Sequence, residues 1–362
     1  MTRVVGHLDL DYFYAQVEEI ENPALRDLPL VVCVYSGRTE DSGVVSTANY
    51  KARELGVKSA IPIAAAKRLL EGTSATFLPM NHGKYQEYSN RVMEILGEQV
   101  DIMEQTGIDE AFFDITKKSA EDYETATKIA VRIKTVILEK EKLTCSIGLA
   151  PNKIIAKLAS DFKKPDGLTS VPPSRIPQFL GPTSVEKLYG VGPKSANILK
   201  GIGIVTVADL AGKDLDELDR VLDHKFSIYL HDAANGVNDE PVVESGEVTQ
   251  LSRMITLKRN SREVQDIVAQ LSPAITDLQS KITNKEVFFH SVSVIGVLPD
   301  LSTKTRSRTL NAPTRDFLSL GNVLTELFTS LLDDGRELRR AGIRVSDLTK
   351  AKAQRSLVEF FG

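Results

Sequence analysis

The chain has 362 residues, of which 42% are apolar and 26% charged, the proportions of a globular protein large enough for two or more domains. A formal net charge of −4 argues against a protein that binds nucleic acid over its whole surface. No run of about eighteen apolar residues is present to span a membrane, and the amino terminus lacks the pattern of a signal peptide, so we expect a cytoplasmic protein.

An apolar run beginning at Val4 predicts a first strand, which ends in the acidic segment Asp9-Leu10-Asp11 before a predicted helix over residues 13–20. Alternate side chains of a strand face the same way, so Asp9 would share a face with His7. The alternative is that Asp9 or Asp11 only caps the helix that follows.

Residues 29–34 predict a second strand, and the latter half of residues 43–53 favours a helix. Thr47, Tyr50 and Arg53 are spaced at three and would share a helix face. A hydroxyl, a phenol and a guanidinium on one face could hold a polyphosphate. The alternative is a surface helix with an ordinary arginine.

A second acidic segment, Asp109-Glu110, lies beside a strand-like run between two predicted helices, residues 84–100 and 120–142. Adjacent side chains diverge in a regular strand, so both carboxylates can aim at one point only near a strand end or turn. Carboxylates that converge from two strands repel one another unless a hard cation lies between them, and Mg²⁺ suits that role. An ordinary solvated turn is the alternative.

A strand over residues 143–149 and a helix over 152–160, followed by a turn at 164–167, complete an α+β layer with a mixed sheet. Cys33 and Cys145 both lie in apolar, strand-like stretches. This context predicts two buried thiols rather than a disulfide, which fits a reducing compartment.

Residues 185–196 place Gly190 and Gly192 between two short helices, with Lys194 just beyond. This pattern is typical of a helix-hairpin-helix, whose exposed N–H groups bind a phosphate without reading bases. A simple helix packing unit is the alternative. The polar stretch that begins at Asn235 predicts a linker and a domain boundary.

Beyond the linker, residues 248–345 predict the order strand, helix, strand, strand, helix, strand, an open sheet with helices on one side. From Gly246 to Ala353, sixteen Lys and Arg stand against twelve Asp and Glu, so this part is basic while the rest is acidic. Its basic strand residues could contact a nucleic-acid backbone, or could be ordinary surface charge. The candidates are Arg253, Arg259, Arg306, Arg308, Arg340 and Arg344.

The tail carries Gln354, an aliphatic residue at Leu357 and paired aromatics at Phe360 and Phe361. One helical turn would present these three apolar side chains together as a plug for a partner. The alternative is a tail folded back onto its own core.

Four ordered segments resemble motifs of the Y-family DNA polymerases, in the DinB or polymerase IV branch and closest to its archaeal members. They are Asp9 to Glu18, Ser46 to Arg53, Ile108 to Ala111, and Ser146 to Lys153 with Lys157. The resemblance covers the whole chain, and the tail is similar to a sliding-clamp (PCNA) interaction box.

The resemblance implies an α+β, multidomain right hand: a palm with a mixed sheet, small fingers, a helical thumb with the helix-hairpin-helix, and a β-α-β-β-α-β little finger. The expected bounds are palm 1–10 and 77–167, fingers 11–76, thumb 168–235, linker 236–245, little finger 246–349 and tail 350–362.

It further implies that Asp9, Asp109 and Glu110 hold two Mg²⁺ ions, with the Leu10 carbonyl as a backbone ligand. One ion would make the primer 3′-hydroxyl a nucleophile, and the other would hold the triphosphate and neutralise the leaving pyrophosphate. Tyr14 would be the steric gate that excludes a ribose 2′-hydroxyl. The expected nucleotide contacts are Tyr12, Phe13, Tyr14, Thr47, Tyr50, Arg53 and Lys157.

Two positions depart from the family pattern. Gly107 stands where the family usually has serine, which removes one possible hydrogen bond near the metals. Val44 and Ser46, the expected roof over the nascent base pair, are larger than the residues that related enzymes often carry there, which affects the expected range of lesions.

We therefore expect a template-directed, low-fidelity DNA polymerase for translesion synthesis that has no proofreading domain. Its expected partners are primer-template DNA, dNTPs and the sliding clamp, and we expect the protein to be a monomer. The clamp would be bound through Gln354, Leu357, Phe360 and Phe361. The alternatives are a non-catalytic scaffold that binds clamp and DNA, and another two-metal palm enzyme such as a nucleotide cyclase.

Overall fold

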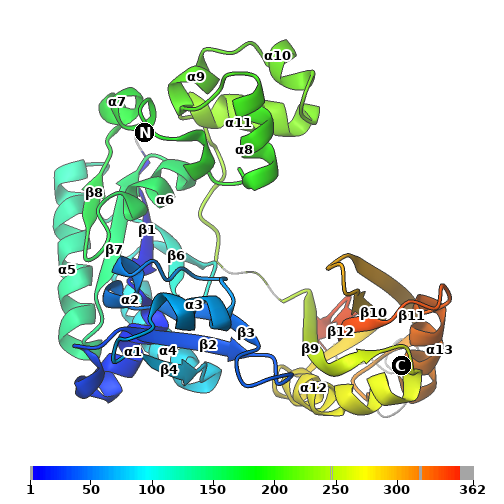
Figure 1. Ribbon diagram of the computed structural model, residues 1–362. Coiled ribbons are helices and arrows are strands. Elements are labelled where there is room, and N and C mark those ends of the chain that lie inside the picture. The colour runs from blue at the N-terminus through cyan, green and yellow to red at the C-terminus, as the bar shows by residue number, and fades with distance from the viewer. Residues whose placement is uncertain (1–2, 245, 247, 318–319, 351–362) are drawn as a thin grey trace, which may run out of the picture. The chain divides into compact units, whose positions relative to one another are not determined.

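The computed structural model describes residues 3–244, 246, 248–317 and 320–350. The chain forms two compact units (Figure 1). The first comprises Met1–Cys33, Val45–Ile61 and Ala65–Gly246; the second comprises Val34–Val44, Pro62–Ala64 and Glu247–Gly362. Among the described residues, no helix combines the length and apolar character needed to cross a bilayer.

A five-stranded sheet forms the centre of the first unit, and its first strand is flanked by two strands from much later in the chain. The order is β5 (Ile102–Gln105), β6 (Glu110–Asp114), β1 (Val5–Leu10), β7 (Cys145–Ala150) and β8 (Leu168–Ser170). Only β7 and β8 pair in parallel, so the expected mixed sheet is confirmed.

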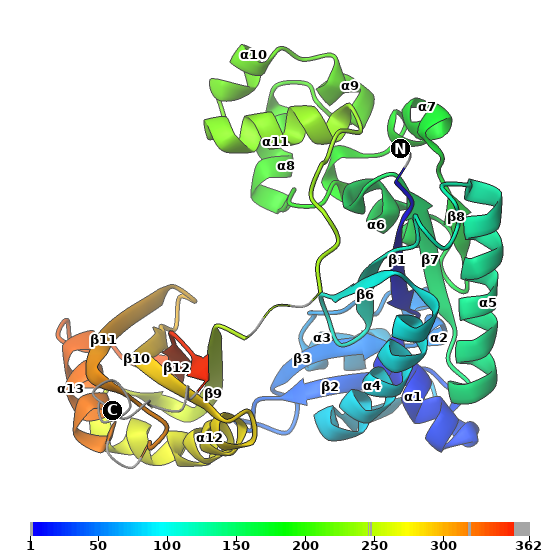
Figure 2. The same ribbon diagram turned by 180° about the vertical axis from the view of Figure 1, so that it is seen from behind.

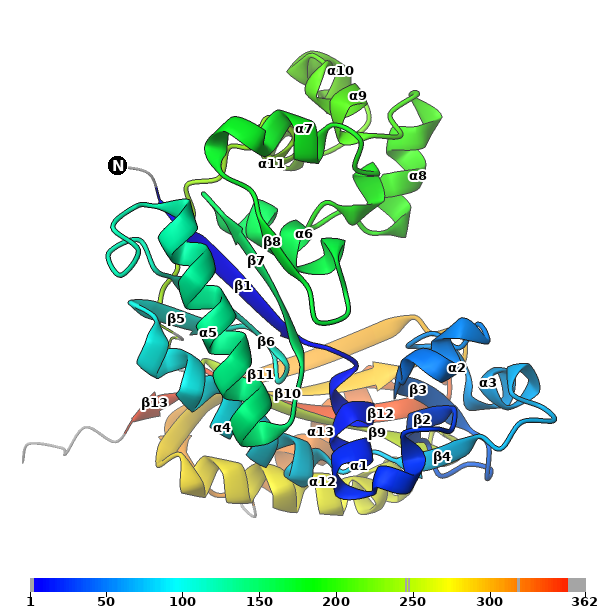
Figure 3. The same ribbon diagram turned by 90° about the vertical axis from the view of Figure 1, so that its left-hand side faces the viewer.

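Helices cover both faces of this sheet, because each face of β1 contributes apolar side chains to a core. Leu8 and Leu10 pack with α4 (His82–Gln99) and α5 (Tyr123–Glu141) in one core, and Val5 packs with α6 (Lys153–Phe162) in another. Figure 3 shows α5 running along one side of the sheet. Asp9, one residue from Leu8 and Leu10, therefore lies on the opposite side of β1 from these leucines.

The second sheet holds the other strands of the amino-terminal region, in the order β3 (Gly43–Ala48), β2 (Leu30–Tyr35) and β4 (Thr76–Pro79). Sequence reasoning found β2 but missed β4 and α3. It also placed Thr47 on a helix, whereas this residue belongs to β3 and α2 begins only at Tyr50. The helices of the region are α1 (Phe13–Glu21), which the 3-10 turn η1 (Pro23–Leu25) follows, α2 (Tyr50–Glu54) and α3 (Ile63–Leu69).

Short helices follow β8 and share the core of α6. They are α7 (Ile176–Leu180), α8 (Pro193–Gly201), α9 (Val207–Ala211), α10 (Leu215–Asp219) and α11 (His224–Ala234), with 3-10 turns η2 (Pro173–Arg175) and η3 (Val185–Lys187). The segment before Gly190, which was expected to be a helix, thus forms only a single 3-10 turn. The turn and α8 still flank the Gly190–Gly192 hairpin.

The first half of the expected linker packs against the sheet layer. Lys153 pairs with Glu240 at 2.8 Å and with Glu104 at 2.6 Å, and Arg3 donates to the Glu240 carbonyl at 3.0 Å. Val242 is buried. The polar composition of this segment predicted a linker, and a lysine and an arginine of the sheet layer bind it by charge and by its backbone.

The second unit holds the expected β-α-β-β-α-β order, with both long helices on one face of its sheet (Figure 2). The strand order is β11 (Thr303–Thr314), β10 (Val287–Val297), β12 (Leu338–Ser346) and β9 (Gln250–Ser261), and β13 (Thr349–Lys350) pairs with β10. The helices α12 (Val264–Asn284) and α13 (Gly321–Leu331) form one core with the sheet.

Both cysteines are buried, and neither forms a disulfide, as expected from their context. Burial raises the pKa of the Cys145 thiol to about 12. We therefore expect no labelling of the native protein by maleimide even at pH 9, where an exposed thiol is largely ionised, and labelling of two thiols after unfolding in guanidinium. Rapid native labelling of Cys145, measured by mass spectrometry, would contradict this placement of β7.

Candidate active site

A cavity of about 370 Å³ opens where the two acidic segments meet the turn between β1 and α1. Its walls come from β1, α1, β3, α2 and the segments before β6 and after α6. They hold Asp9, Leu10, Tyr12, Phe13, Tyr14, Ser46, Thr47, Tyr50, Arg53, Ser59, Asp109 and Lys164. Ten of these twelve residues are ones that the sequence marked, which leaves Ser59 and Lys164 as additions.

The two acidic segments are neighbours because β1 and β6 pair in antiparallel fashion. The register sets Asp9 opposite Glu110, and the Leu10 N–H donates to the Asp109 carbonyl at 2.9 Å. The N–H groups of Thr106 and Gly107 both donate to the Glu110 carbonyl, which closes a tight turn just before β6. Asp109 and Glu110 therefore lie at a strand start, the one place where adjacent carboxylates can face a common region.

Each outer carboxylate of the cluster is paired with a lysine of α6 or of the turn after it. Lys164 lies 2.7 Å from Asp9 and 2.8 Å from Asp161. Lys157 pairs with Glu110, which is turned toward this lysine and His7 and does not line the cavity. Lys157, which was expected to contact the nucleotide, pairs here with the acidic cluster, and its nucleotide contact stays a prediction. Lys164 was not predicted, because it is the first residue of the predicted turn 164–167 and belongs to no motif.

The three carboxylates differ in their affinity for protons. Burial raises the pKa of Asp9, and burial together with the charge of Glu110 raises the pKa of Asp109. The pKa of Glu110 is lowered to about 2, because the Lys157 ammonium donates to this carboxylate. Burial lowers the pKa of His7, so the ring is neutral at pH 7 and the Lys157 ammonium supplies the stabilising charge.

The oxygen atoms of these residues suit a hard divalent cation, although the side chains are not arranged as a complete coordination site. In the described part of the chain, no three acidic, histidine or cysteine side chains are grouped as metal ligands. The clustered carboxylates nevertheless repel one another, and the two lysines now balance their charge. Carboxylate oxygens and a backbone carbonyl at Leu10 are the ligands that Mg²⁺ prefers, so the expected ligand set stays a prediction with compatible chemistry.

Thr47, Tyr50 and Arg53 line the same cavity, as the sequence suggested, but through a different construction. Arg53 Nη2 donates to the Thr47 hydroxyl at 3.4 Å, and its Nε donates to the Ala48 carbonyl at 2.8 Å. The guanidinium lies 5.1 Å from the centre of the Tyr50 ring. A strand residue and two helix residues thus present a cation and two hydroxyls, a suitable surface for phosphate oxygens.

The Tyr14 ring forms a rigid part of the cavity wall. It stacks on Tyr85 with 4.3 Å between ring centres and 15° between planes. Tyr85 is fully buried, and its hydroxyl donates to Glu18 at 2.7 Å. Phe13 is buried beside Tyr14, and the Tyr12 hydroxyl donates to Glu19. A ring fixed in this way can exclude a substituent by its position alone.

The two expected roof residues differ in exposure. Ser46 lines the cavity and its hydroxyl lies 3.8 Å from the Met80 sulfur. Val44 is 43% exposed on β3. A role for either above a base pair stays a prediction.

Because Gly107 has no side chain, the side chain of Glu110 can lie close to it. A Cβ at this position would lie 2.9 Å from Glu110 Cγ and 3.3 Å from Asp109 Oδ1. A serine, as in the family pattern, would therefore require the Glu110 side chain to shift. The departure at Gly107 affects the placement of the acidic pair, in addition to removing a possible hydrogen bond.

Asp11, the other acid of the first segment, has a structural role. It is buried, accepts from the Ser146 hydroxyl at 2.8 Å and accepts from the Asp166 N–H at 2.8 Å. It ties the end of β1 to β7 and to the turn before β8. It neither caps α1 nor lines the cavity.

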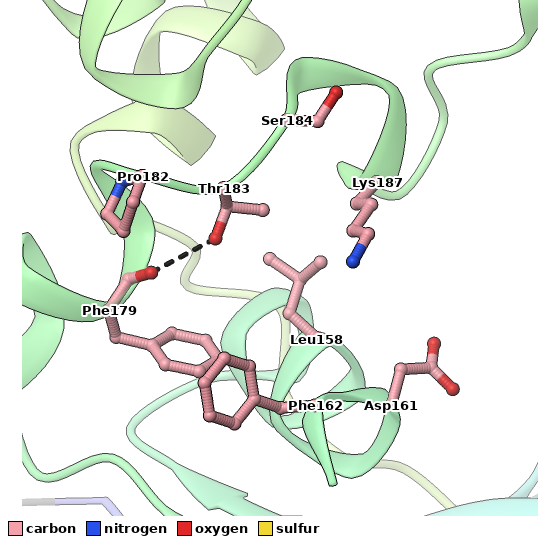
Figure 4. Close-up of a pocket in the computed structure, with 8 residues that line it drawn as sticks. All are labelled: Leu158, Asp161, Phe162, Phe179, Pro182, Thr183, Ser184 and Lys187. Atoms are coloured by element: carbon pink, nitrogen blue, oxygen red, sulfur yellow. Dashed lines mark hydrogen bonds between the residues drawn. The ribbon is translucent and has the colours of Figure 1, made fainter. Parts of the chain in front are cut away.

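A larger cavity of about 630 Å³ lies between the end of α6 and the segment around α7 and η3 (Figure 4). It is lined by Leu158, Asp161, Phe162, Phe179, Pro182, Thr183, Ser184 and Lys187. The Thr183 hydroxyl donates to the Phe179 carbonyl across its wall at 3.0 Å. This wall carries none of the expected metal or nucleotide residues, so the chemistry of the lining, and not its volume, identifies the smaller cavity as the candidate site.

The expected helix-hairpin-helix has an open helix start. Gly190 has φ of +86°, and a Cβ there would lie 3.3 Å from the Tyr229 ring, so glycine suits both the turn and the packing. A Cβ on Gly192, the N-cap of α8, would meet no atom within 4 Å, and Lys194 is exposed in the first turn. A phosphate contact here stays a prediction.

The basic residues of the second unit do not form one face, contrary to the simplest expectation. Val292, Val294 and Ile343 are buried toward the helices, and they pair in register with Arg308, Arg306 and Arg253. Because paired residues share a face, these three arginines lie on the helix side of the sheet. They contact carboxylates of the helical layer: Arg253 with Asp277, Arg306 with Asp333 and Arg308 with Glu326.

The opposite face of this sheet carries short hydroxyls and two arginines. Ser293 pairs in register with Ser307 and Arg344, and the two serine hydroxyls lie 2.8 Å apart. Arg340 has the same strand parity as Arg344 and is exposed. Arg259 is exposed on β9. Of the six candidates, Arg340 and Arg344 are the ones that the structure places on the open face.

The candidate clamp-binding residues of the tail, Gln354, Leu357, Phe360 and Phe361, lie outside the described residues.

Sequence comparison identifies relatives along the whole chain. The impB/mucB/samB family matches residues 8–161, and its C-terminal domain matches residues 248–357. The chain is 41% identical to "DNA polymerase IV 1" of Methanosarcina mazei over 366 residues, which cover 99% of this chain and all of that protein. It is 39% identical to "DNA polymerase IV" of Nitrosopumilus maritimus, again over 99% of this chain and all of the relative.

Comparison with solved structures leads to the same family. A chimera of the Y-family DNA polymerases Dbh and Dpo4 gives a TM-score of 0.87 at 35% identity, covering 96% of this chain and 99% of the chimera. An insertion ternary complex of Dbh DNA polymerase gives a TM-score of 0.71 at 36% identity with the same coverage. The α+β architecture described above is therefore shared with these proteins.

Proposed function

The chain belongs to the impB/mucB/samB family in the DinB branch of the Y-family DNA polymerases, so it is a DNA-directed DNA polymerase of translesion synthesis, and we propose that the cavity at Asp9 and Asp109 is its active site. One observation carries this proposal: residues from widely separated sequence segments line one cavity. Acidic side chains lie there with a cation and hydroxyls suited to a triphosphate, and an aromatic wall faces the same space.

Asp9, Asp109 and Glu110, with the Leu10 carbonyl, would hold two Mg²⁺ ions. When bound, such ions activate the attacking hydroxyl and neutralise the leaving pyrophosphate. Thr47, Tyr50 and Arg53 would bind and orient the triphosphate, and Lys157 and Lys164 would turn from the carboxylates toward its oxygens. Tyr14 would face the sugar of the incoming nucleotide.

The DNA is proposed to contact the start of α8 and the open face of the second unit. Gly190, Gly192 and Lys194 offer N–H groups and a cation at a helix start, which suits a phosphate. Arg340 and Arg344 lie on a face of small hydroxyls that lets a backbone approach closely. Solved relatives bear titles of ternary complexes, which is consistent with dNTP and primer-template binding.

The function is tested by primer extension with Mg²⁺, a primed template and all four dNTPs. The expected result is extension that follows the template and stops when Mg²⁺ is chelated. A nucleotide cyclase would instead convert a single nucleotide without DNA, and a scaffold would give neither product. Template-independent or absent product would contradict the assignment of the cavity.

The tail is proposed to bind the sliding clamp, with the protein acting as a cytoplasmic monomer. Deleting residues 354–362 should leave basal extension unchanged and remove most of the stimulation by the clamp, because the apolar plug would be lost while the described fold is intact. Extension with and without loaded clamp measures this. The matched control replaces Lys350 and Lys352 by alanine and should keep the stimulation. Collapse of basal activity in the deletion would show that the tail is a structural element instead.

A further inference from the structure

His7 is fully buried on β1, two residues before Asp9. Its Nδ1 lies 2.8 Å from the Ser160 hydroxyl, and its Nε2 lies 3.4 Å from both the Lys157 ammonium and the Glu110 carboxylate. The ring packs on Phe112 with 4.6 Å between ring centres. A buried polar ring in contact with two site residues has no assigned role in the proposed mechanism.

Ser160 determines which imidazole nitrogen carries the proton. The single hydroxyl proton of Ser160 is donated to the Lys157 carbonyl at 2.8 Å. The serine oxygen can then only accept from His7, so Nδ1 must be the donor. In a neutral imidazole the other nitrogen has a lone pair and no proton, and Nε2 is therefore an acceptor.

The lone pair on Nε2 faces an ammonium. Glu110 carries no proton to share with His7, so their 3.4 Å approach is not a hydrogen bond, and Lys157 is the donor to both. Lysine is a compact charge on a flexible four-carbon chain, and two acceptors restrict where that charge can lie. If Glu110 becomes a metal ligand, its hold on Lys157 weakens, and His7 is the acceptor that remains.

We propose that His7 is a positioning residue: with its tautomer set by Ser160, it holds the Lys157 ammonium at the rim of the acidic cluster, ready for the phosphates of the incoming nucleotide. The inference rests on the proposed function, because it takes Lys157 as a nucleotide contact. It adds a buried His–Ser pair that acts on substrate binding without touching substrate.

Three substitutions separate the acceptor from the packing of the ring. His7→Phe keeps a ring but has no acceptor; His7→Gln brings an amide oxygen near the place of Nε2; His7→Asn keeps a polar group only near Ser160. We expect His7→Phe and His7→Asn to raise the KM for dNTP about ten-fold, the loss of a hydrogen bond to a charged donor, with little change in kcat. His7→Gln should restore most of the affinity.

The route through Lys157 is tested by combining substitutions. Adding His7→Phe to Lys157→Ala should change the KM no further, because the positioned group is already gone. Ser160→Ala should raise the KM by a smaller factor, since the ring is then free to present either nitrogen. The control is Ser227→Ala, which removes another fully buried hydroxyl that donates to a carbonyl of its own helix, far along the chain in α11, and should leave the KM unchanged.

Equal KM values for His7→Phe, His7→Gln and the unaltered protein would overturn the proposal. So would effects of His7→Phe and Lys157→Ala that multiply, or KM changes that simply follow the thermal unfolding temperature of each variant. Failure of the proposed function gives a different result, because the unaltered protein would then extend no primer at all.

Discussion

Replacing Asp109 by alanine should abolish primer extension, with a loss of about three orders of magnitude or more in kcat/KM. The carboxylate is partly buried in the cavity wall. The other acid of the lining, Asp9, is itself a proposed ligand, and Glu110 faces Lys157, so neither could substitute for Asp109. Glu110→Ala should have a similar effect, because it removes a proposed ligand and releases Lys157. Single-turnover extension with each variant measures the loss.

Two control variants distinguish chemistry from folding. Asp109→Asn keeps the volume but removes the charge and should be as inactive as the alanine variant. Asp114→Asn, at the other end of β6, keeps an acceptor for the Thr116 N–H and should extend primers normally. An Asp109→Asn protein with more than about a tenth of the normal rate would contradict a metal-ligand role for Asp109.

Tyr14→Ala should admit ribonucleotides, with discrimination against the 2′-hydroxyl falling about a hundred-fold or more. The ring is rigid because it stacks on the buried Tyr85, whose hydroxyl is held by Glu18. Deleting the ring therefore opens space that neighbouring side chains are too constrained to fill. The ratio of kcat/KM for dNTP and rNTP measures the gate.

Tyr14→Phe is the matched control, because it keeps the ring and its stacking and should leave sugar discrimination nearly unchanged. Tyr85→Ala should weaken discrimination partly, since Tyr14 would lose its support. Unaltered sugar discrimination in Tyr14→Ala would remove the gate assignment while leaving the rest of the site intact.

Much of the site could be predicted because its residues sit in short segments with strong local signals. The apolar alternation of β1 fixes the face of Asp9, and the strand start at Glu110 is the place where adjacent acids can converge. The spacing of Thr47, Tyr50 and Arg53 predicted their meeting, although through a helix that includes only two of them. The three residues were correctly predicted to lie together, although Thr47 was wrongly placed on the helix.

The rest depends on tertiary pairing that no local pattern encodes. Lys164 reaches Asp9 only because the turn after α6 returns to the end of β1. The face on which Arg253, Arg306 and Arg308 lie depends on strand register, and a shift of one residue would move them to the other side. His7 lacked a sequence signal beyond alternation, because its partners Ser160 and Lys157 lie some 150 positions away.

The central claim is that acids at the end of β1 and at the start of the neighbouring strand β6 hold the metal ions at one shared site. It is tested most directly by crystals of the protein with primer-template DNA, a non-reactive dNTP analogue and Mn²⁺, located by anomalous scattering. The account predicts two Mn²⁺ peaks about 3.5–4 Å apart, in contact with Asp9, Asp109 and Glu110 beside the triphosphate. Mn²⁺ bound elsewhere, or bound without Asp9, would contradict it.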